Sequence, residues 1–273
     1  MASGAGGDIR FFHSAAVAND SDLEDFFTEE YRLNHLIFTY PKPYIAFMDG
    51  IVMGGGMGIS QGASIRIVTE RSKLAMPETN IGLFPDVGGG YFLSRCPGAS
   101  GEYLALTGQM MLGADAISLG LADNLADSAY IGTLWDDLTT DPTLSVADRL
   151  KILEERLEAS TPVYHQPSWM DSAIDACFAK ATVSGIVQAL TDLDSDWANA
   201  CIKTMRQRSP LMLHVVLEQI HRARHMTLAN DLRMERDLVR HCFHTKHLNR
   251  SGHSSETVEG IRALAIDKDH SPQ

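Results

Sequence analysis

The sequence predicts an α/β fold whose first half carries the strands and whose second half is helical. Short apolar runs with strand patterning alternate with helical stretches between residues 44 and 95, and glycine-dense loops separate them. From about residue 145, apolar residues recur at helical spacing and strand signals almost vanish. Short strands that alternate with helices are typical of layered α/β folds. We therefore predict an α/β core over residues 1–128 and a helical C-terminal region over 129–273.

In the core, residues 9–40 are predicted to form a helix that Pro41 ends. The apolar positions at helical spacing are Leu23, Phe26, Phe27, Leu33 and Leu36. Strands are predicted at 44–48, 64–69 and 73–76, a helix start after 54–56, a glycine-rich loop at 82–90 and a helix near 91–95.

In the C-terminal region the predicted helices are 146–159, 171–180, 184–206, 210–226 and 228–243. Several Ser and His residues with Gly252 predict an exposed loop over 244–257.

The charge balance excludes some classes of partner. The chain has 23 Lys and Arg against 35 Asp and Glu, a formal net charge of −12. Such a surface repels phosphate backbones, so nucleic acid is not an expected partner. No apolar run approaches the roughly 18 residues needed to cross a bilayer. An anionic small ligand would need a local basic patch.

Cysteine and histidine spacing does not favour a metal site. The cysteines lack metal-ligand spacing and are predicted to be reduced core residues: Cys96, Cys177, Cys201 and Cys242. His221 and His225 share one helix face, but no HExxH pattern or third ligand accompanies them, so zinc is disfavoured.

Two glycine clusters could bind negative charge. In residues 54–58 the backbone N–H groups lie near a predicted helix start, which favours a phosphate or a developing oxyanion. No Gly-Lys-Ser/Thr follows, so a P-loop is excluded. A second cluster, 4–8, could supply another amide donor. The alternatives are a tight packing turn for the first cluster and a flexible tail for the second.

Two acids lie after strand signals, where α/β folds place reactive groups. Glu78 follows Pro77, and Asp86 follows Pro85. Two close carboxyls raise one pKa and could act as base or nucleophile beside an acid. The alternatives are a helix N-terminal acid for Glu78 and a turn residue for Asp86. Glu29 and Glu30 together are typical of a solvated helix face.

In combination, these segments resemble the crotonase (enoyl-CoA hydratase/isomerase) superfamily and, within it, the 3-hydroxyisobutyryl-CoA hydrolases. The matching runs are 41–46 (PKPYIA), 53–58 (MGGGMG), 75–79 (AMPET), 81–93 (IGLFPDVGGGYFL), 106–108 (LTG), 120–122 (GLA), 209–210 (SP), 259–263 (EGIRA) and 266–269 (IDKD). The resemblance spans nearly the whole chain and is weakest from about 129 to 200.

The resemblance implies a crotonase-like spiral of ββα units with a helical C-terminal region. It places oxyanion-hole amides at Gly7 and Gly55 and substrate-binding positions at Glu30, Gly55, Glu78 and Asp86, with Glu78 and Asp86 catalytic. It implies an acyl-CoA substrate and no metal or redox cofactor, because coenzyme A belongs to the substrate. A homo-oligomer remains open.

Within the superfamily, the acids distinguish hydration from hydrolysis. Hydratases use two glutamates around the attacking water; the first position corresponds here to Gly58 and the second to Glu78. Asp86 stands where hydratases usually carry a glycine. This pattern implies hydrolysis of a short β-hydroxyacyl-CoA such as 3-hydroxyisobutyryl-CoA, an intermediate of valine breakdown. An enoyl-CoA hydratase or isomerase and a non-catalytic acyl-CoA binder are the alternatives.

The glycine turn at 4–8 normally follows a strand, so we expect the family's first strands to be missing from this sequence. The compartment follows from the source: the cytoplasm in a bacterium, the mitochondrial matrix in a eukaryote.

Overall fold

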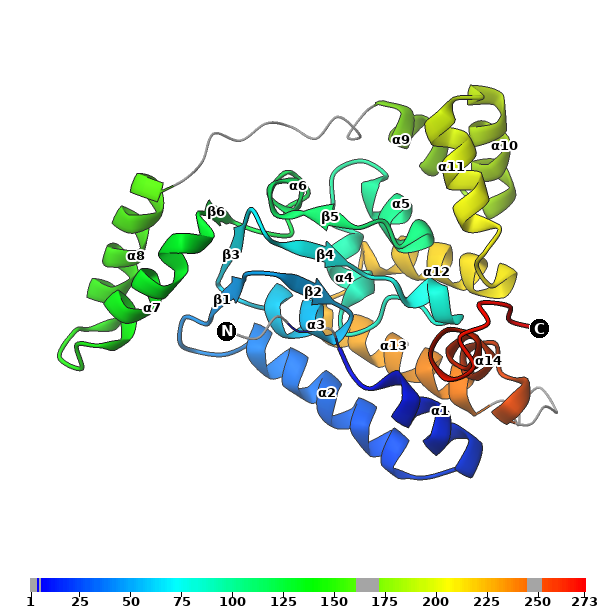
Figure 1. Ribbon diagram of the computed structural model, residues 1–273, viewed down its shortest axis with the longest axis horizontal. Coiled ribbons are helices and arrows are strands. Elements are labelled where there is room, and N and C mark those ends of the chain that lie inside the picture. The colour runs from blue at the N-terminus through cyan, green and yellow to red at the C-terminus, as the bar shows by residue number, and fades with distance from the viewer. Residues whose placement is uncertain (1–3, 5, 161–171, 245–251) are drawn as a thin grey trace.

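The computed structural model describes residues 4, 6–160, 172–244 and 252–273. A central group of strands is flanked by helices, with α7 and α8 at one end and α9 to α11 near the other (Figure 1). Every strand in the described residues lies before residue 127. The mixed α/β class predicted from the sequence is confirmed.

Six short strands form two sheets of three strands each. The strands are β1 (Ile45–Met48), β2 (Ile51–Met53), β3 (Ile65–Thr69), β4 (Lys73–Ala75), β5 (Met111–Leu112) and β6 (Asn124–Ala126). One sheet has the order β1-β3-β6 and is parallel throughout. In the other, β2 pairs parallel with β4, and β4 pairs antiparallel with β5.

Successive strands divide between the two sheets, which produces the predicted spiral. β1 and β3 open two ββ units in the first sheet, and β2 and β4 close those units in the second. A helix follows each unit: α3 (Gly55–Gln61) after β2, and η1 (Glu78–Ile81) with α4 (Gly89–Leu93) after β4. The helix starts therefore lie just beyond the ends of neighbouring strands β2 and β4, and this arrangement brings their residues into one site.

The remaining helices surround this core (Figure 1). They are α1 (Ile9–Ala18), α2 (Asp22–Phe38), α5 (Ser100–Thr107), α6 (Gly113–Ser118), η2 (Ser128–Tyr130), α7 (Ile131–Thr139), α8 (Val146–Ser160), α9 (Ser172–Phe178), α10 (Val183–Leu193), α11 (Asp196–Met205), α12 (Pro210–Ala223), α13 (Leu228–Phe243), η4 (Gly252–Ser254), α14 (Glu256–Ile261) and the π-helical turn η5 (Arg262–Ile266).

Two long helices predicted from periodicity are each broken in two. The helix predicted over 9–40 ends at Asn19, which adopts φ +56° and caps α1 before α2 begins. The helix predicted over 184–206 stops at Asp194 with φ +44°, and the side chain of Ser195 caps α11 by accepting from the N–H of Ala198. Both predictions were wrong for the same reason: left-handed single residues reverse the chain without interrupting the apolar spacing.

The predicted exposed loop over 244–257 is wrong at its C-terminal end, where α14 begins, although Ser254 is exposed. Ser255 and Thr257 are buried. The Ser255 side chain caps α14 through the N–H of Val258, and the Thr257 hydroxyl donates to the carbonyl of Gly82 at 2.7 Å. Polar residues thus attach α14 to the turn after η1. Residues 245–251 lie outside the described part of the chain.

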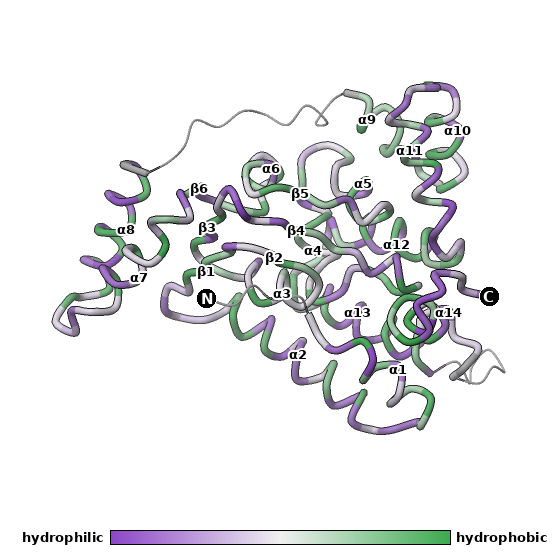
Figure 2. Tube along the Cα trace, in the orientation of Figure 1, coloured by the Kyte–Doolittle hydropathy of each residue, from purple (hydrophilic) through white to green (hydrophobic). Residues whose placement is uncertain are grey.

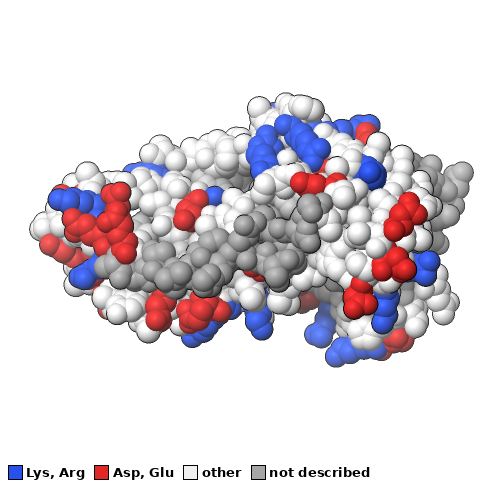
Figure 3. Space-filling model, turned by 90° about the horizontal axis from the view of Figure 1, so that it is seen from above, with Lys and Arg blue, Asp and Glu red and all other residues white. Residues whose placement is uncertain are grey.

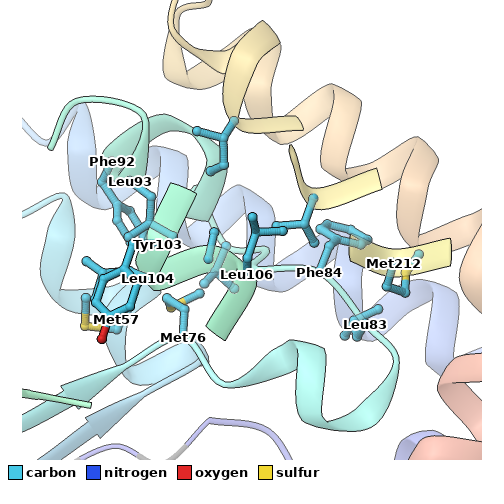
Figure 4. Packing of buried hydrophobic residues seen from close by; sticks show 14 of the residues in the cluster. Met57, Met76, Leu83, Phe84, Phe92, Leu93, Tyr103, Leu104, Leu106 and Met212 are labelled. Atoms are coloured by element: carbon cyan, nitrogen blue, oxygen red, sulfur yellow. The ribbon is translucent and has the colours of Figure 1, made fainter. Parts of the chain in front are cut away.

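One large apolar core joins the second sheet to the C-terminal helices. Methionines, leucines and aromatic side chains from α3, the loop after η1, α5 and α12 meet in it, among them Met57, Phe84, Tyr103 and Met212 (Figure 4). All four cysteines are buried and free, as predicted. A smaller cluster packs α7 and α8 against the first sheet through Ile67, Ala126, Ile131, Leu134, Leu153 and Leu157.

Amphipathic helices enclose this core. The traces of α2 and α8 alternate between hydrophobic and hydrophilic residues along their length (Figure 2), as expected of helices with one buried face. Acidic and basic side chains are mixed on the face seen in Figure 3. Among the described residues, no helix is both long and apolar enough to cross a membrane.

Candidate active site

A cavity of about 190 Å³ lies between the N-terminal glycine turn, α2, the start of α3 and the loop after η1. Its lining includes all five residues that the resemblance assigns to the site: Gly7, Glu30, Gly55, Glu78 and Asp86. Apolar side chains from α1, α2 and η5, such as Phe12, Phe27 and Leu264, form its walls. The structure therefore brings into one cavity residues that lie up to 79 positions apart in the sequence, from Gly7 to Asp86.

The two glycine clusters meet in this cavity. The carbonyl of Gly4 accepts a hydrogen bond of 3.0 Å from the N–H of Met53. A Cβ added to Gly6 would lie 3.1 Å from the nitrogen of Gly55, and one added to Gly55 would lie 3.2 Å from the Cα of Gly6. A side chain at Gly6 or Gly55 would therefore force the two backbone segments apart. The first glycine cluster is thus docked against the second.

Gly55 is the first residue of α3, where a helical N–H has no intrahelical acceptor. Among the described residues, neither the N–H of Gly55 nor that of Gly7 has a hydrogen-bond acceptor. Gly54 reaches this helix start with φ +52°, a conformation that glycine adopts without strain. Backbone N–H groups of this kind are the donors that oxyanion holes use, and both glycines line the same cavity.

Glu78 starts η1 directly after Pro77 and is buried. One carboxyl oxygen, Oε1, lies 3.0 Å from the place where a Cβ on Gly54 would stand. The other, Oε2, is buried without a hydrogen-bond partner among the described residues. A buried carboxyl oxygen without a partner is unusual in a folded protein, and Glu78 combines this feature with a place in the lining of the cavity.

Asp86 lies in the loop between η1 and α4 and is buried. Its Oδ2 accepts a hydrogen bond of 2.9 Å from the Tyr31 hydroxyl. Tyr31 was missed in the sequence, because a tyrosine in the apolar stripe of a helix has no distinguishing pattern. Its neighbour Glu30 was the only available indication.

The adjacent acids of α2 have different environments. Glu29 is exposed and forms an ion pair of 2.7 Å with Arg32. Glu30 faces the cavity, where its Oε1 lies 2.8 Å from the position of a Cβ on Gly55. The interpretation of Glu29 and Glu30 as one solvated face therefore holds for Glu29 alone.

The three cavity carboxyls are electrostatically coupled. Burial, followed by the charge of Asp86, raises the pKa of Glu30 to about 8. Burial raises the pKa of Glu78 well above its ordinary value, and Asp86 and Glu30 add to this rise. Burial also raises the pKa of Asp86, to about 6, although the hydrogen bond from Tyr31 opposes the increase. The pKa of Asp86 thus lies below that of Glu30, so Asp86 ionises before Glu30 as the pH rises.

The space beside Gly58 is filled by a neighbouring side chain. A Cβ added to Gly58 would lie 2.6 Å from the Cβ of Val87 and 2.9 Å from Nδ2 of Asn34. Val87 adopts φ +54°, which is rare for a β-branched residue. The glutamate that hydratases carry at this position would not fit here without displacement of Val87.

The histidines considered for zinc lie elsewhere. Nε2 of His221 is 3.7 Å from Oε1 of Glu102, and His225 is exposed. Neither residue lines the cavity.

Comparisons with known proteins show the family of this chain. The family model described as enoyl-CoA hydratase/isomerase matches residues 1–273. The mitochondrial 3-hydroxyisobutyryl-CoA hydrolase of Mus musculus is 39% identical over 98% of this chain and 68% of its own length. The Danio rerio protein of the same name is 40% identical over 98% of this chain and 69% of its length.

Solved structures show the same fold. A carnitinyl-CoA dehydratase from Mycobacterium thermoresistibile has a TM-score of 0.84 and 36% identity, and covers 98% of this chain and 75% of its own. An enoyl-CoA hydratase from Rhodobacter sphaeroides 2.4.1 has a TM-score of 0.81 and 35% identity over 98% and 74% of the two chains. This chain belongs to the enoyl-CoA hydratase/isomerase family and, within it, is similar to the 3-hydroxyisobutyryl-CoA hydrolases.

Proposed function

We propose that the protein hydrolyses 3-hydroxyisobutyryl-CoA to 3-hydroxyisobutyrate and free coenzyme A, a step of valine breakdown. The observation that carries the proposal is the set of acids in the cavity. Glu78 and Asp86 are present and buried, whereas the first hydratase glutamate is replaced by Gly58 and its space is filled by Val87. Relatives about 40% identical are named for this hydrolysis.

The glycine amides act on the thioester carbonyl. In the proposed reaction the N–H groups of Gly7 and Gly55 donate to the carbonyl oxygen as it gains negative charge. Each such donor contributes about 3 kcal/mol to stabilising the transition state. Gly55 packs closely against Gly6, and Gly7 packs closely against Phe12 and Phe26, so little reorganisation of either amide is needed when charge develops.

Glu78 supplies the attack in one of two ways. Its carboxylate can add to the thioester carbon; the C–S bond then breaks, and the departing coenzyme A thiolate takes a proton. Water next hydrolyses the resulting anhydride and restores Glu78. Alternatively, Glu78 removes a proton from a water that attacks the same carbon directly. Burial raises the pKa of Glu78 and so makes its carboxylate a stronger base in either route.

Asp86 and Glu30 orient the polar end of the acyl group. Tyr31 bonds to Oδ2 of Asp86, which leaves Oδ1 for the substrate hydroxyl or the water. Glu30 lies close to Gly55 and adds a carboxyl group to the lining of the cavity. We propose that the reaction needs no metal or redox cofactor, and that a eukaryotic source would place it in the mitochondrial matrix. The names of the relatives describe those proteins as mitochondrial.

Release of free thiol from 3-hydroxyisobutyryl-CoA tests this proposal. We expect Glu78→Gln to lower kcat by at least about 100-fold, because Gln can neither attack nor accept a proton. Glu29→Gln is the matched control, since Glu29 is exposed and paired with Arg32 outside the cavity. Equal rates of thiol release in the parent and Glu78→Gln would overturn the role of Glu78.

Hydration is a second candidate function because the solved relatives carry the titles of a dehydratase and a hydratase. Hydration of crotonyl-CoA, followed by loss of absorbance of its conjugated double bond, tests it. We expect this rate to be far below that of thiol release. Binding of acyl-CoA without either reaction would instead indicate a non-catalytic binder.

A further inference from the structure

The loop that carries Asp86 is held by buried side chains from α12 and α13. On one side of Asp86, Nε2 of Gln219 donates to the carbonyl of Pro85 at 2.7 Å. On the other side, Glu235 accepts from two loop amides, at 2.8 Å from Gly88 and at 3.1 Å from Gly90. These contacts join residues almost 150 positions apart in sequence.

This loop has an unfavourable backbone conformation that needs external support. Val87 has φ +54° and Gly88 has φ +89°. A β-branched residue in the left-handed region costs on the order of 1–3 kcal/mol and persists only where surrounding contacts enforce it. The amide that follows this strained residue is the one bound by Oε2 of Glu235.

The conformation has two consequences for the site. It aims Asp86 toward Tyr31 and the cavity, and it places the side chain of Val87 in the space beside Gly58. A relaxed loop would change both at once. The conformation of this loop therefore determines where Asp86 lies relative to the other acids of the cavity.

We propose that Glu235 is a positioning residue of the active site, which fixes the loop of Asp86 and Val87 through the amides of Gly88 and Gly90. The proposal rests on the proposed function only for its kinetic consequences. Glu235 does not line the cavity, so it acts through the loop and not on the substrate.

The contacts around Glu235 indicate that it positions the loop and does not merely fill space in the core. It is fully buried, and so is Asp231, one helical turn away on α13. Oδ2 of Asp231 accepts from the N–H of Tyr91 at 2.8 Å, which extends the contact to the start of α4. Burial, Asp231 and Asp86 all raise the pKa of Glu235. Two buried acids are costly to keep and are offset here by loop amides.

The test compares Glu235→Gln and Glu235→Leu with Glu102→Gln. Glu102 is a suitable control because it is also a buried glutamate, paired with Arg224, but it does not line the cavity or contact the loop. Gln at 235 keeps one carbonyl acceptor but turns an N–H₂ group toward the second amide, whereas Leu accepts from neither. Thermal unfolding is measured for each variant alongside kinetics.

We expect Glu235→Gln to lower kcat about tenfold and Glu235→Leu about 100-fold, with KM changed less than about threefold, because small misplacements of reacting groups have effects of this size. Glu102→Gln is expected to melt earlier but to keep its kcat. An unchanged kcat in Glu235→Leu, or an equal loss of kcat in Glu102→Gln, would overturn the proposal.

Hydrogen exchange separates this proposal from the proposed function. Amides of residues 88–91 should exchange faster in Glu235→Gln than in the parent, and at the parent rate in Glu102→Gln. Unchanged exchange in Glu235→Gln contradicts the proposal whether or not the protein hydrolyses the thioester. If the parent releases no thiol but Glu235→Gln still exchanges faster than the parent, the control of the loop by Glu235 is supported and the hydrolase assignment fails.

Discussion

Tyr31 donates a hydrogen bond of 2.9 Å from its hydroxyl to Oδ2 of Asp86, and both groups are buried. This contact links α2 to the loop before α4. It stabilises the ionised form of Asp86 in a cavity that otherwise favours the neutral acid. The charge of the acid cluster near neutral pH depends on it.

Tyr31→Phe should therefore shift the pH dependence of the reaction. Loss of the hydrogen bond raises the pKa of Asp86 above about 6, so the acidic limb of kcat/KM moves to higher pH. We expect about a tenfold loss at pH 6, since a hydrogen bond to a charged group contributes about 1.5–3 kcal/mol. Rates measured from pH 5 to 9 check this.

Tyr44→Phe is the control for the loss of a phenol, because Tyr44 does not line the cavity. An acidic limb at the same pH in the parent and Tyr31→Phe would show that Asp86 does not control it.

Gly55→Ala should damage the oxyanion hole. The new Cβ would lie 2.8 Å from Oε1 of Glu30 and 3.2 Å from the Cα of Gly6, so the two glycine turns must separate. We expect kcat to fall about 100-fold, as for loss of one oxyanion donor. Steady-state kinetics with 3-hydroxyisobutyryl-CoA measure this loss.

Gly132→Ala is the matched control, because Gly132 is exposed on α7 and an added Cβ would meet nothing within 4 Å. It should keep full activity and melt slightly later, since alanine favours the helix. Similar kcat values in the two variants would argue against a tight glycine contact in the site.

The sequence predicted β1, β3, β4 and the glycine turns, because each has a local pattern, but it missed β2, β5 and β6, which are only two or three residues long. Strands 65–69 and 73–75 match the predicted runs within a residue. The breaks at Asn19 and Asp194 were missed, because single left-handed residues leave the apolar periodicity intact. Burial of Ser255 and Thr257 could not be predicted either, since their partners, Cys242 and Gly82, lie elsewhere in the sequence.

The site itself was predicted unevenly. Gly55, Glu78 and Asp86 were identified through motif resemblance, whereas their spacing alone left structural roles equally open. Tyr31 and Glu235 were missed, because their importance arises from hydrogen bonds to residues 55 and about 150 positions away. Such long-range contacts depend on the tertiary fold and leave no local signature.

Gly58→Glu should not create a hydratase. The added side chain would begin 2.6 Å from the Cβ of Val87, and overpacking of this kind destabilises a protein by about 1–3 kcal/mol. We expect an earlier thermal transition and no gain in crotonyl-CoA hydration. Addition of Val87→Gly should restore part of the lost stability, because it removes the contact with the Val87 side chain and the strained φ but leaves the contact with Asn34. Appreciable hydration by Gly58→Glu alone would contradict the geometry.

Glu30 should make folding stability depend on pH. Its pKa in the folded protein is about 8, against 4.5 for an ordinary glutamate, so the folded state holds this proton more tightly than the unfolded state. The resulting stabilisation is fully present below pH 4.5 and is lost as pH rises through about 8. Glu30→Gln removes this pH-dependent loss. The free energy of unfolding of Glu30→Gln, from urea denaturation, should therefore fall less between pH 5 and pH 8 than that of the parent. Glu29→Gln, at the exposed neighbouring position, should follow the parent, and a parallel pH dependence in all three proteins would show that Glu30 titrates normally.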